Sequence, residues 1–194
     1  RYRAARDELA RTQGNNAPEF VDSLRTAGFD SFAQTGLPTT RWENWKYTDV
    51  KGIAKTEYRH ADLVAGGAPS PEDLVAFRGA APGAVEIVLV NGAFSPELSS
   101  LESTPSGVHL GGLAACARDN ASDVSNLLGS VADMKDHPFI ALNTAFLGDG
   151  VFLRIDQDVE VEGIIHILHI AGHSEEEVVS HPRLLIAAGA NSRA

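Results

Sequence analysis

The stretch that decides the fold runs from VFLRI (residues 151–155) through IIHILHI (164–170) to RLLIAA (183–188). Short apolar runs of this length, separated by Asp, Glu, Gly and Pro, predict strands rather than helices. The run 164–170 is apolar on both faces, so we expect it inside a sheet with neighbouring strands and cover on both sides. The segment GANSRA (189–194) follows directly after a predicted strand and leaves that strand's edge unpaired. Because the chain also begins at Arg1 without a methionine, we expect a fragment whose β domain has only begun.

Composition limits the classes of function. The 194 residues carry 26 Asp and Glu against 16 Lys and Arg, a formal net charge of −10. This acidic balance argues against broad binding to nucleic acid or anionic membranes, although it is compatible with a local basic patch. Cys116 is the single cysteine, which excludes an intrachain disulfide and fits a reducing, cytoplasmic compartment. No apolar run approaches the roughly 20 residues that a membrane-spanning helix needs.

Upstream of the strands the sequence predicts mostly helices. Residues 2–13 form a charged, alanine-rich helix, and Pro18 opens a second helix that we expect to close at Gly28. The sequence Ser70-Pro71-Glu72-Asp73 has the hydroxyl cap, first-turn proline and acids of a helix start. Further helices are expected over 113–117, 122–131 and 138–147.

Two strands are predicted within this upstream part. They are VEIVLV (85–90), followed by the turn signal Asn91-Gly92, and residues 108–110. The helical patterns end at Gly148-Asp149-Gly150. We therefore divide the chain into an N-terminal mixed α/β region (1–148) and the beginning of a β core (149–194), which makes the fold class α+β.

An aromatic segment stands out near the N-terminus, because both tryptophans and one of three tyrosines lie between Trp42 and Tyr47. Large aromatic side chains with polar tips, flanked by Arg41 and Lys46, either anchor a loop onto a domain or form a binding patch with cation–π contacts. Aromatic side chains serve packing more often than recognition, so we expect these rings to anchor the segment.

This segment resembles a motif of the SufB/SufD family of iron–sulfur cluster assembly proteins. The match is to R-x-E-x-W-K-Y-T-D, and it favours the SufD branch because SufB usually lacks the tryptophans. Three further stretches occur in the family's order, namely FIALNTAF (139–146) followed by Asp149-Gly150, then HPR (181–183), then GANS (189–192). The motif residues, with a structural or interaction role, are Arg41, Glu43, Trp45, Lys46, Tyr47, Thr48, Asp49, Asn143, His181, Pro182, Arg183 and Asn191.

The resemblance implies a fold and a set of partners. Residues 149–194 would be the first coils of a truncated right-handed single-stranded β-helix, after a helical N-terminal region. The protein would be a non-catalytic scaffold that pairs with SufB through the β core and binds the SufC ATPase through a C-terminal region absent here. The complex builds clusters with sulfur from a cysteine desulfurase system. A reduced flavin is associated with such complexes, so the resemblance places clusters and flavin at the level of the complex and no cofactor on these residues alone.

The histidines raise a metal hypothesis, because five of the seven lie between His137 and His181. In a strand, His166 and His169 point to opposite faces and do not chelate one ion together, so we expect no metal site. Cys116, in the apolar context LAACA, is expected to be buried and inert. One thiolate does not hold an iron–sulfur cluster, which takes about four.

The remaining residues nominate no catalytic or cofactor-binding centre. Walker, G-x-G-x-x-G and G-x-S-x-G sequences are absent. Four acids alternate with valines, which predicts a polar face of an exposed strand; they are Asp156, Asp158, Glu160 and Glu162.

Two other classes of function stay open. A β-helical polysaccharide-cleaving enzyme uses carboxylates with Arg or Lys, a pattern that the acidic run and Arg154 faintly repeat. The hexapeptide periodicity of β-helical acyltransferases is absent. A carbohydrate- or protein-binding module would use Trp42, Trp45 and Tyr47 as a stacking platform.

Overall fold

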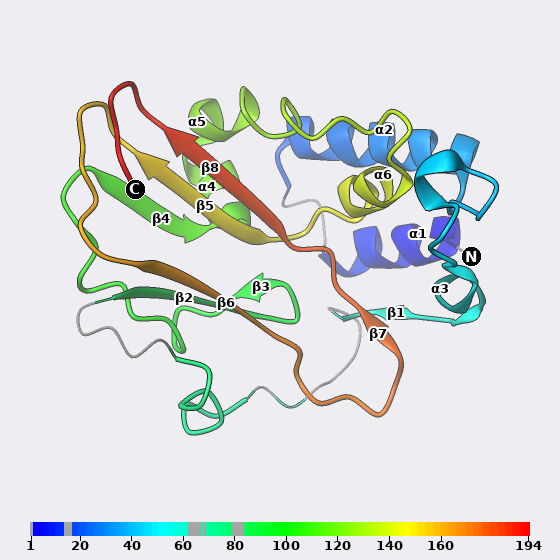
Figure 1. The fold of residues 1–194 in the computed structure, drawn as a ribbon, viewed down its shortest axis with the longest axis horizontal. Coiled ribbons are helices and arrows are strands. Elements are labelled where there is room, and N and C mark those ends of the chain that lie inside the picture. Colours follow the sequence, from blue (N-terminus) through cyan, green and yellow to red (C-terminus); the bar gives the residue numbers. More distant parts are fainter. Residues whose placement is uncertain (1, 14–16, 62–66, 68, 79–83) are drawn as a thin grey trace.

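The computed structural model describes residues 2–13, 17–61, 67, 69–78 and 84–194 (Figure 1). Some helices gather at one end of the molecule and others lie against a sheet, so the fold is mixed α+β as the sequence predicts. No sheet of the described residues closes into a barrel. The helices are α1 (Tyr2–Gln13), α2 (Glu19–Thr35), the 3-10 turn η1 (Glu43–Trp45), α3 (Lys51–Lys55), α4 (Leu113–Asp119), α5 (Ala121–Ser125) and α6 (Pro138–Ala145). The strands are β1 (Arg59–His60), β2 (Val85–Val90), β3 (Ala93–Phe94), β4 (Val108–Gly112), β5 (Gly150–Ile155), β6 (Ile165–Ile170), β7 (Val178–Val179) and β8 (Arg183–Ala188).

The four C-terminal strands pass through three sheets in turn. Strand β5 lies in the sheet β4-β5-β8, β6 in the sheet β3-β2-β6, and β7 in the pair β1-β7. Strand β8 then returns to lie parallel to β5, with Gly150 opposite Arg183 and Ile155 opposite Ala188. The chain thus completes one circuit in 33 residues, and its later strands β6, β7 and β8 each run parallel to an earlier one.

The core lies between the two three-stranded sheets. Val151, Leu153 and Ile155 of β5 project toward Ile87 and Leu89 of β2 and the neighbouring β6, whereas Phe152 projects the other way, onto α4. This is the alternation expected of a strand with two covered faces. Strand β6 is apolar on both faces as predicted, but in the described part it pairs only with β2 and its residues stay half-exposed.

The hairpin after β2 follows the prediction. Asn91 and Gly92 both have positive φ (52° and 89°), and they join β2 to β3 with Val90 opposite Ala93. Positive φ at both central residues is the geometry that Asn-Gly favours in two-residue hairpin turns.

Four expectations about local structure were wrong, including the helix end predicted at Gly28. Residues 71–77 form consecutive turns instead of a helix, although Ser70 and Asp73 make the expected capping hydrogen bonds (2.8–3.4 Å). Helix α5 ends at Ser125, and turns follow it. The acidic run 156–162 is no strand, because the chain turns at Asp158 (φ 61°) so that Val159 and Val161 pack on the core beside Ile155.

Helix α2 does not close at Gly28 but continues to Thr35, because this glycine is a point of close approach between helices. A Cβ placed on Gly28 would lie 2.6 Å from the backbone nitrogen of Ala145 and 2.9 Å from the carbonyl oxygen of Ala141, both on α6. The pair α2–α6, with Phe29 and Phe32 of α2 against Ala141 and Ala145 of α6, forms the core of the helical end together with Leu9 of α1.

We expect Gly28→Ala to lower the free energy of unfolding by about 1–3 kcal/mol, because the added methyl group forces α6 away from α2. Gly52→Ala in α3 is the control, since a Cβ there meets no atom within 4 Å. In a helix the control change is expected to be neutral or to stabilise by up to about 1 kcal/mol. Urea denaturation of both variants tests the difference, and equal behaviour would contradict the close packing of α2 and α6.

Candidate functional site

Two of the sequence motifs meet where α6 faces the start of β8. Asn143 of α6 donates a hydrogen bond from Nδ2 to the carbonyl oxygen of Pro182 (3.0 Å). Its Oδ1 accepts two hydrogen bonds from Arg183, from Nε (3.0 Å) and Nη2 (2.6 Å), and Nη2 also donates to Thr144 Oγ1 (2.9 Å). Burial lowers the pKa of Arg183. We call this set, Asn143, Thr144, Pro182 and Arg183, the α6–β8 clamp.

The motif residues Asp149 and Gly150 complete this junction from the β5 side. Asp149 accepts hydrogen bonds from the backbone N–H groups of Phe94 (3.0 Å) and Ala114 (2.9 Å), so one carboxylate ties β3 and α4 together. A Cβ on Gly150 (φ 154°) would lie 1.9 Å from the carbonyl oxygen of Arg183. The position therefore requires glycine, because the backbones of β5 and β8 touch there.

A stack of three rings lies beside the clamp. The rings of His60, Phe146 and His181 have centroids 5.1–5.9 Å apart and planes within 26° of parallel. They line a cavity of about 20 Å³, the size of one water molecule, together with Asn91 and Asp149. Burial, with a smaller contribution from His60, lowers the pKa of His181 to about 4, so this imidazole is neutral at physiological pH. The stack joins β1, the end of α6 and the entry to β8.

The aromatic segment is placed mainly at the surface. Trp45 contacts Phe139 of α6, with ring centroids 5.3 Å apart, which is the anchoring role expected for it. Tyr47 is 92 % exposed, however, and the Nζ of Lys46 lies 5.6 Å from its ring centroid. The other motif residues of the segment are also exposed, and they are Arg41, Glu43, Thr48 and Asp49. The structure thus separates this segment from Pro182 and Arg183, with Trp45 and Phe139 as its link to α6.

The last motif, GANS, stacks on an earlier turn of the chain. Asn191 donates from Nδ2 to Asp158 Oδ1 (3.0 Å), and both residues have positive φ (59° and 61°). Asn191 follows Asp158 by 33 residues, the same offset that relates β8 to β5. A Cβ on Gly189 would lie 2.5 Å from the backbone nitrogen of Gln157, so the two turns are in backbone contact. The turn after β8 therefore repeats the turn after β5 directly above it.

The two histidines of β6 lie in different environments. His166 Nδ1 lies 3.0 Å from Glu86 Oε2, and Arg78 Nε lies 3.0 Å from Glu86 Oε1, so the buried carboxylate has a partner on each side. His169 is exposed. Among the residues that the structure describes, no group of three or more His, Cys, Asp or Glu side chains is placed to hold a metal ion.

Cys116 lies half-buried on α4. Burial, with Asp119 and Asp149 nearby, raises the pKa of its thiol, so the thiolate that would bind iron is disfavoured. The prediction of a buried side chain therefore holds only in part, and the prediction that it is inert stays a prediction.

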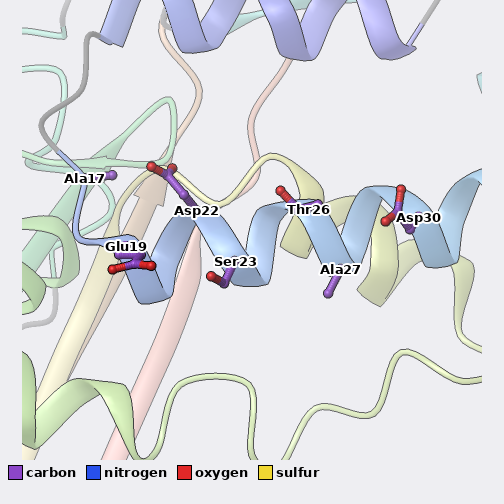
Figure 2. A pocket seen from close by; sticks show the side chains of 7 residues that line it. All are labelled: Ala17, Glu19, Asp22, Ser23, Thr26, Ala27 and Asp30. Atoms are coloured by element: carbon purple, nitrogen blue, oxygen red, sulfur yellow. The ribbon is translucent and has the colours of Figure 1, made fainter.

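A second candidate is an open hollow of about 660 Å³ along α2. Figure 2 shows its carboxylates and small polar side chains along the helix, and Glu19, Asp22 and Asp30 are among the residues that line it. Asp22 already forms an ion pair with Arg25 (3.0 Å). The acidic residues that line this hollow are those of an ordinary solvent-exposed helix face, so they need no ligand to explain them.

Sequence reasoning missed several residues of the junction. Thr144 was not predicted as a site residue, the hydrogen bonds of Asp149 and the close approach at Gly150 were not foreseen, and the partnership of His60 with His181 had no local signal. The signal that could have found Asp149 and Gly150 is the pair Asp-Gly immediately before a buried strand, at the point where the helical pattern ends.

Comparison with known proteins identifies the family of this chain. The protein-family model described as the SufBD protein N-terminal region matches residues 2–167 of this chain. An iron–sulfur cluster assembly SufBD family protein of Synechocystis sp. is 29 % identical over 188 residues, which is 96 % of this chain and 40 % of that relative. The chain thus spans about two fifths of the length of this relative.

The chain is a mixed α+β protein whose C-terminal strands begin to stack in parallel. It belongs to the SufB/SufD family of iron–sulfur cluster assembly proteins. No helix within the described residues is both long and apolar enough to cross a membrane.

We expect Asn143→Ala to lower the free energy of unfolding by about 2–4 kcal/mol, because the half-buried guanidinium of Arg183 loses its double acceptor. Asn126→Ala is the control, since Asn126 makes one exposed hydrogen bond to the carbonyl of Ser122 (3.3 Å) and should contribute less than about 0.5 kcal/mol. Chemical denaturation measures both. A loss for Asn143→Ala no larger than that of the control would show that the clamp is not a stabilising contact.

The buried His181 predicts a dependence of stability on pH. Its folded pKa of about 4 lies below the usual 6.5, so the unfolded chain binds the proton first as pH falls. Stability is therefore full above about pH 7 and is lost between pH 6.5 and 4, by roughly 3 kcal/mol for this group. The charged groups near it are Asp149 across the cavity and Arg183 two residues on.

The measurement is urea denaturation at pH 7, 6 and 5 for the wild type and for His181→Phe, which keeps an aromatic ring in the stack but does not titrate. The variant is expected to lose less stability than the wild type over this range. Parallel pH profiles would show that His181 is not held neutral in the folded state.

Proposed function

We propose that this chain is the N-terminal part of a SufD-like, non-catalytic scaffold subunit that works with SufB- and SufC-like partners in the cytoplasm to assemble iron–sulfur clusters. Membership of the SufB/SufD family supports the role in cluster assembly. The tryptophan-containing segment between Arg41 and Asp49 supports the SufD branch over SufB.

The observation that carries the scaffold proposal is the stacking of one coil on the next. Strand β8 pairs in register with β5, and the turn containing Asn191 stacks on the turn containing Asp158 at the same offset of 33 residues. A repeated strand and a repeated turn at one offset are what a β-helix requires, because each coil covers only its neighbours. We therefore propose that residues 149–194 begin a β-helix, with residues 1–148 as the N-terminal region.

Exposed apolar residues on β8 support continuation of this core. Leu184 and Ile186 lie beside Val151 and Leu153 in the β5–β8 register, yet they are 43 % and 54 % exposed, whereas their neighbours are 0 % and 5 % exposed. A sheet edge with such a row of side chains favours the addition of another strand. We propose that further coils cover this face, and that a SufB-like subunit pairs with the completed core.

In this proposal the iron–sulfur cluster is cargo of the assembled complex, and a reduced flavin, where used, is also held at that level. The environments of Cys116 and His181 fit this assignment, because burial disfavours the charged form of both side chains. The motif residues Asn143, Pro182 and Arg183 then have the role of fixing the entrance of the β core to the helical region.

The test is co-expression of the full-length protein with the SufB- and SufC-like proteins of the same organism, followed by affinity purification and gel filtration under reducing conditions. We expect the three chains to elute together. A variant Ile186→Asp should lower the yield of complex at least about fivefold if the next coil covers β8. Val131→Asp is the matched control, because Val131 is 90 % exposed outside the sheets.

Recovery of the full-length wild-type protein without either partner would contradict the scaffold role. Cleavage of a polyuronide by the same preparation would instead favour the polysaccharide-cleaving alternative.

A further inference from the structure

Positive charge is concentrated in two segments of this acidic chain. Residues 1–13 and 37–59 hold nine of the 16 Lys and Arg but five of the 26 Asp and Glu. These 36 residues therefore have a net charge of +4, while the remainder of the chain has −14. The two segments meet in space, since Arg59 forms ion pairs with Glu8 of α1 (3.7 Å) and with Glu176 (3.3 Å).

An apolar groove lies between these segments, where α1, α2 and α3 come together at one end of the molecule (Figure 1). It has a volume of about 620 Å³ and is lined by Tyr2 of α1, Phe29, Phe32 and Ala33 of α2, Leu37, and Ala54 of α3. Tyr2 packs edge-on against Phe32, with ring centroids 4.9 Å apart, so the floor is aromatic and fixed. We call it the α1–α3 groove.

Cations lie over the floor and along the rim of the groove. The guanidinium carbons of Arg3 and Arg6 lie 5.2 Å and 4.5 Å from the ring centroid of Phe29. On α3, Lys51 shares a helix face with Ala54, and Ile53 beside it is 40 % exposed. The groove thus combines an apolar floor with positively charged edges.

We propose that the α1–α3 groove docks an acidic amphipathic helix from another protein. Grooves between helices accept the apolar face of such a helix, and the flanking carboxylates would pair with the cations of the rim. The remainder of this chain is negatively charged and repels an acidic partner, so such a partner is attracted to this basic end.

The same observations favour a protein partner over nucleic acid. A phosphate backbone is bound through cations and polar donors and gains nothing from a recessed apolar floor. The floor offers recessed apolar area, which suits leucine-like side chains. This inference stands apart from the proposed function, because it rests on the N-terminal helices and not on the β core.

The experiment measures fluorescence anisotropy of a labelled synthetic peptide with the full-length protein. The probe is a helix of about 16 residues, with leucines at i, i+4 and i+7 and glutamates on the flanking positions. One comparison peptide carries lysine in place of every glutamate, and a second has the same composition with the leucines scattered around the helix. Binding of the first peptide should exceed that of either comparison peptide at least about tenfold, and it should weaken with added salt.

Two alanines of α2 provide matched variants, because both are exposed and each lines a different hollow of similar volume. Ala33→Trp fills the α1–α3 groove, and Ala27→Trp fills the acidic hollow of Figure 2. We expect Ala33→Trp to weaken binding of the acidic peptide at least about tenfold and Ala27→Trp to change it less than about twofold.

Three outcomes would overturn the proposal. They are no saturable binding of the acidic amphipathic peptide, equal effects of the two tryptophan variants, and tighter binding of single-stranded oligothymidylate or phosphatidylserine vesicles than of the peptide. The last outcome would assign the basic end to phosphate groups instead of to a protein helix.

Discussion

The parallel pairing of β8 with β5 is the interaction on which the rest of the structure depends. It obliges the chain to leave one sheet, contribute a strand to each of two others, and return after 33 residues. The return is held at its start by Asn143 and Arg183 and at its end by Asn191 and Asp158. The helical end and the sheets also meet where Phe152 packs on α4 and where the ring of His60 lies against Phe146. The motif residues Asn143, Pro182 and Arg183 lie at the first of these ends, and Asn191 lies at the second.

Much of the fold could be predicted, because strong local signals agree with the tertiary contacts. Helix α1, the β2–β3 hairpin and the strands β5, β6 and β8 follow from periodicity and from Asn91-Gly92. The prediction for Gly28 was wrong because a glycine that ends a helix and a glycine that allows close helix packing have the same sequence signal. The contact that distinguishes them, with Ala145 of α6, is visible only in the structure. The strand predicted for the acidic run after β5 was wrong. Val159 and Val161 point toward the core from a loop, so the alternation of acidic and apolar residues does not indicate a strand there.

The candidate site shows a different balance. The motif residues Asn143, Pro182 and Arg183 could be singled out from sequence, but their contact spans about 40 positions and no local pattern encodes it. His60 illustrates the same limit, since its ring meets Phe146 and His181 only after β1 pairs with β7. Burial keeps His181 neutral, and Asn143 and Arg183 are hydrogen-bonded to each other, which suits a joint between two parts of a protein.

The stacked turns at Asp158 and Asn191 restrict where the chain can change in length. The β5–β8 pair and the pair of turns at Asp158 and Asn191 share one offset of 33 residues. Deleting a residue from 156–163 would therefore shift the register of every later strand and turn against the coil before it. An insertion within 171–177 would instead bulge outward as a surface loop, since the described contacts of that connection are few, namely the bridge of His173 to Gly67, the hydrogen bond of Gly172 to Asn91 and the exposed ion pair of Glu176 with Arg59. Length variation among relatives is therefore expected at the corner before β7, and the corner after β5 should keep its length even where its residues differ.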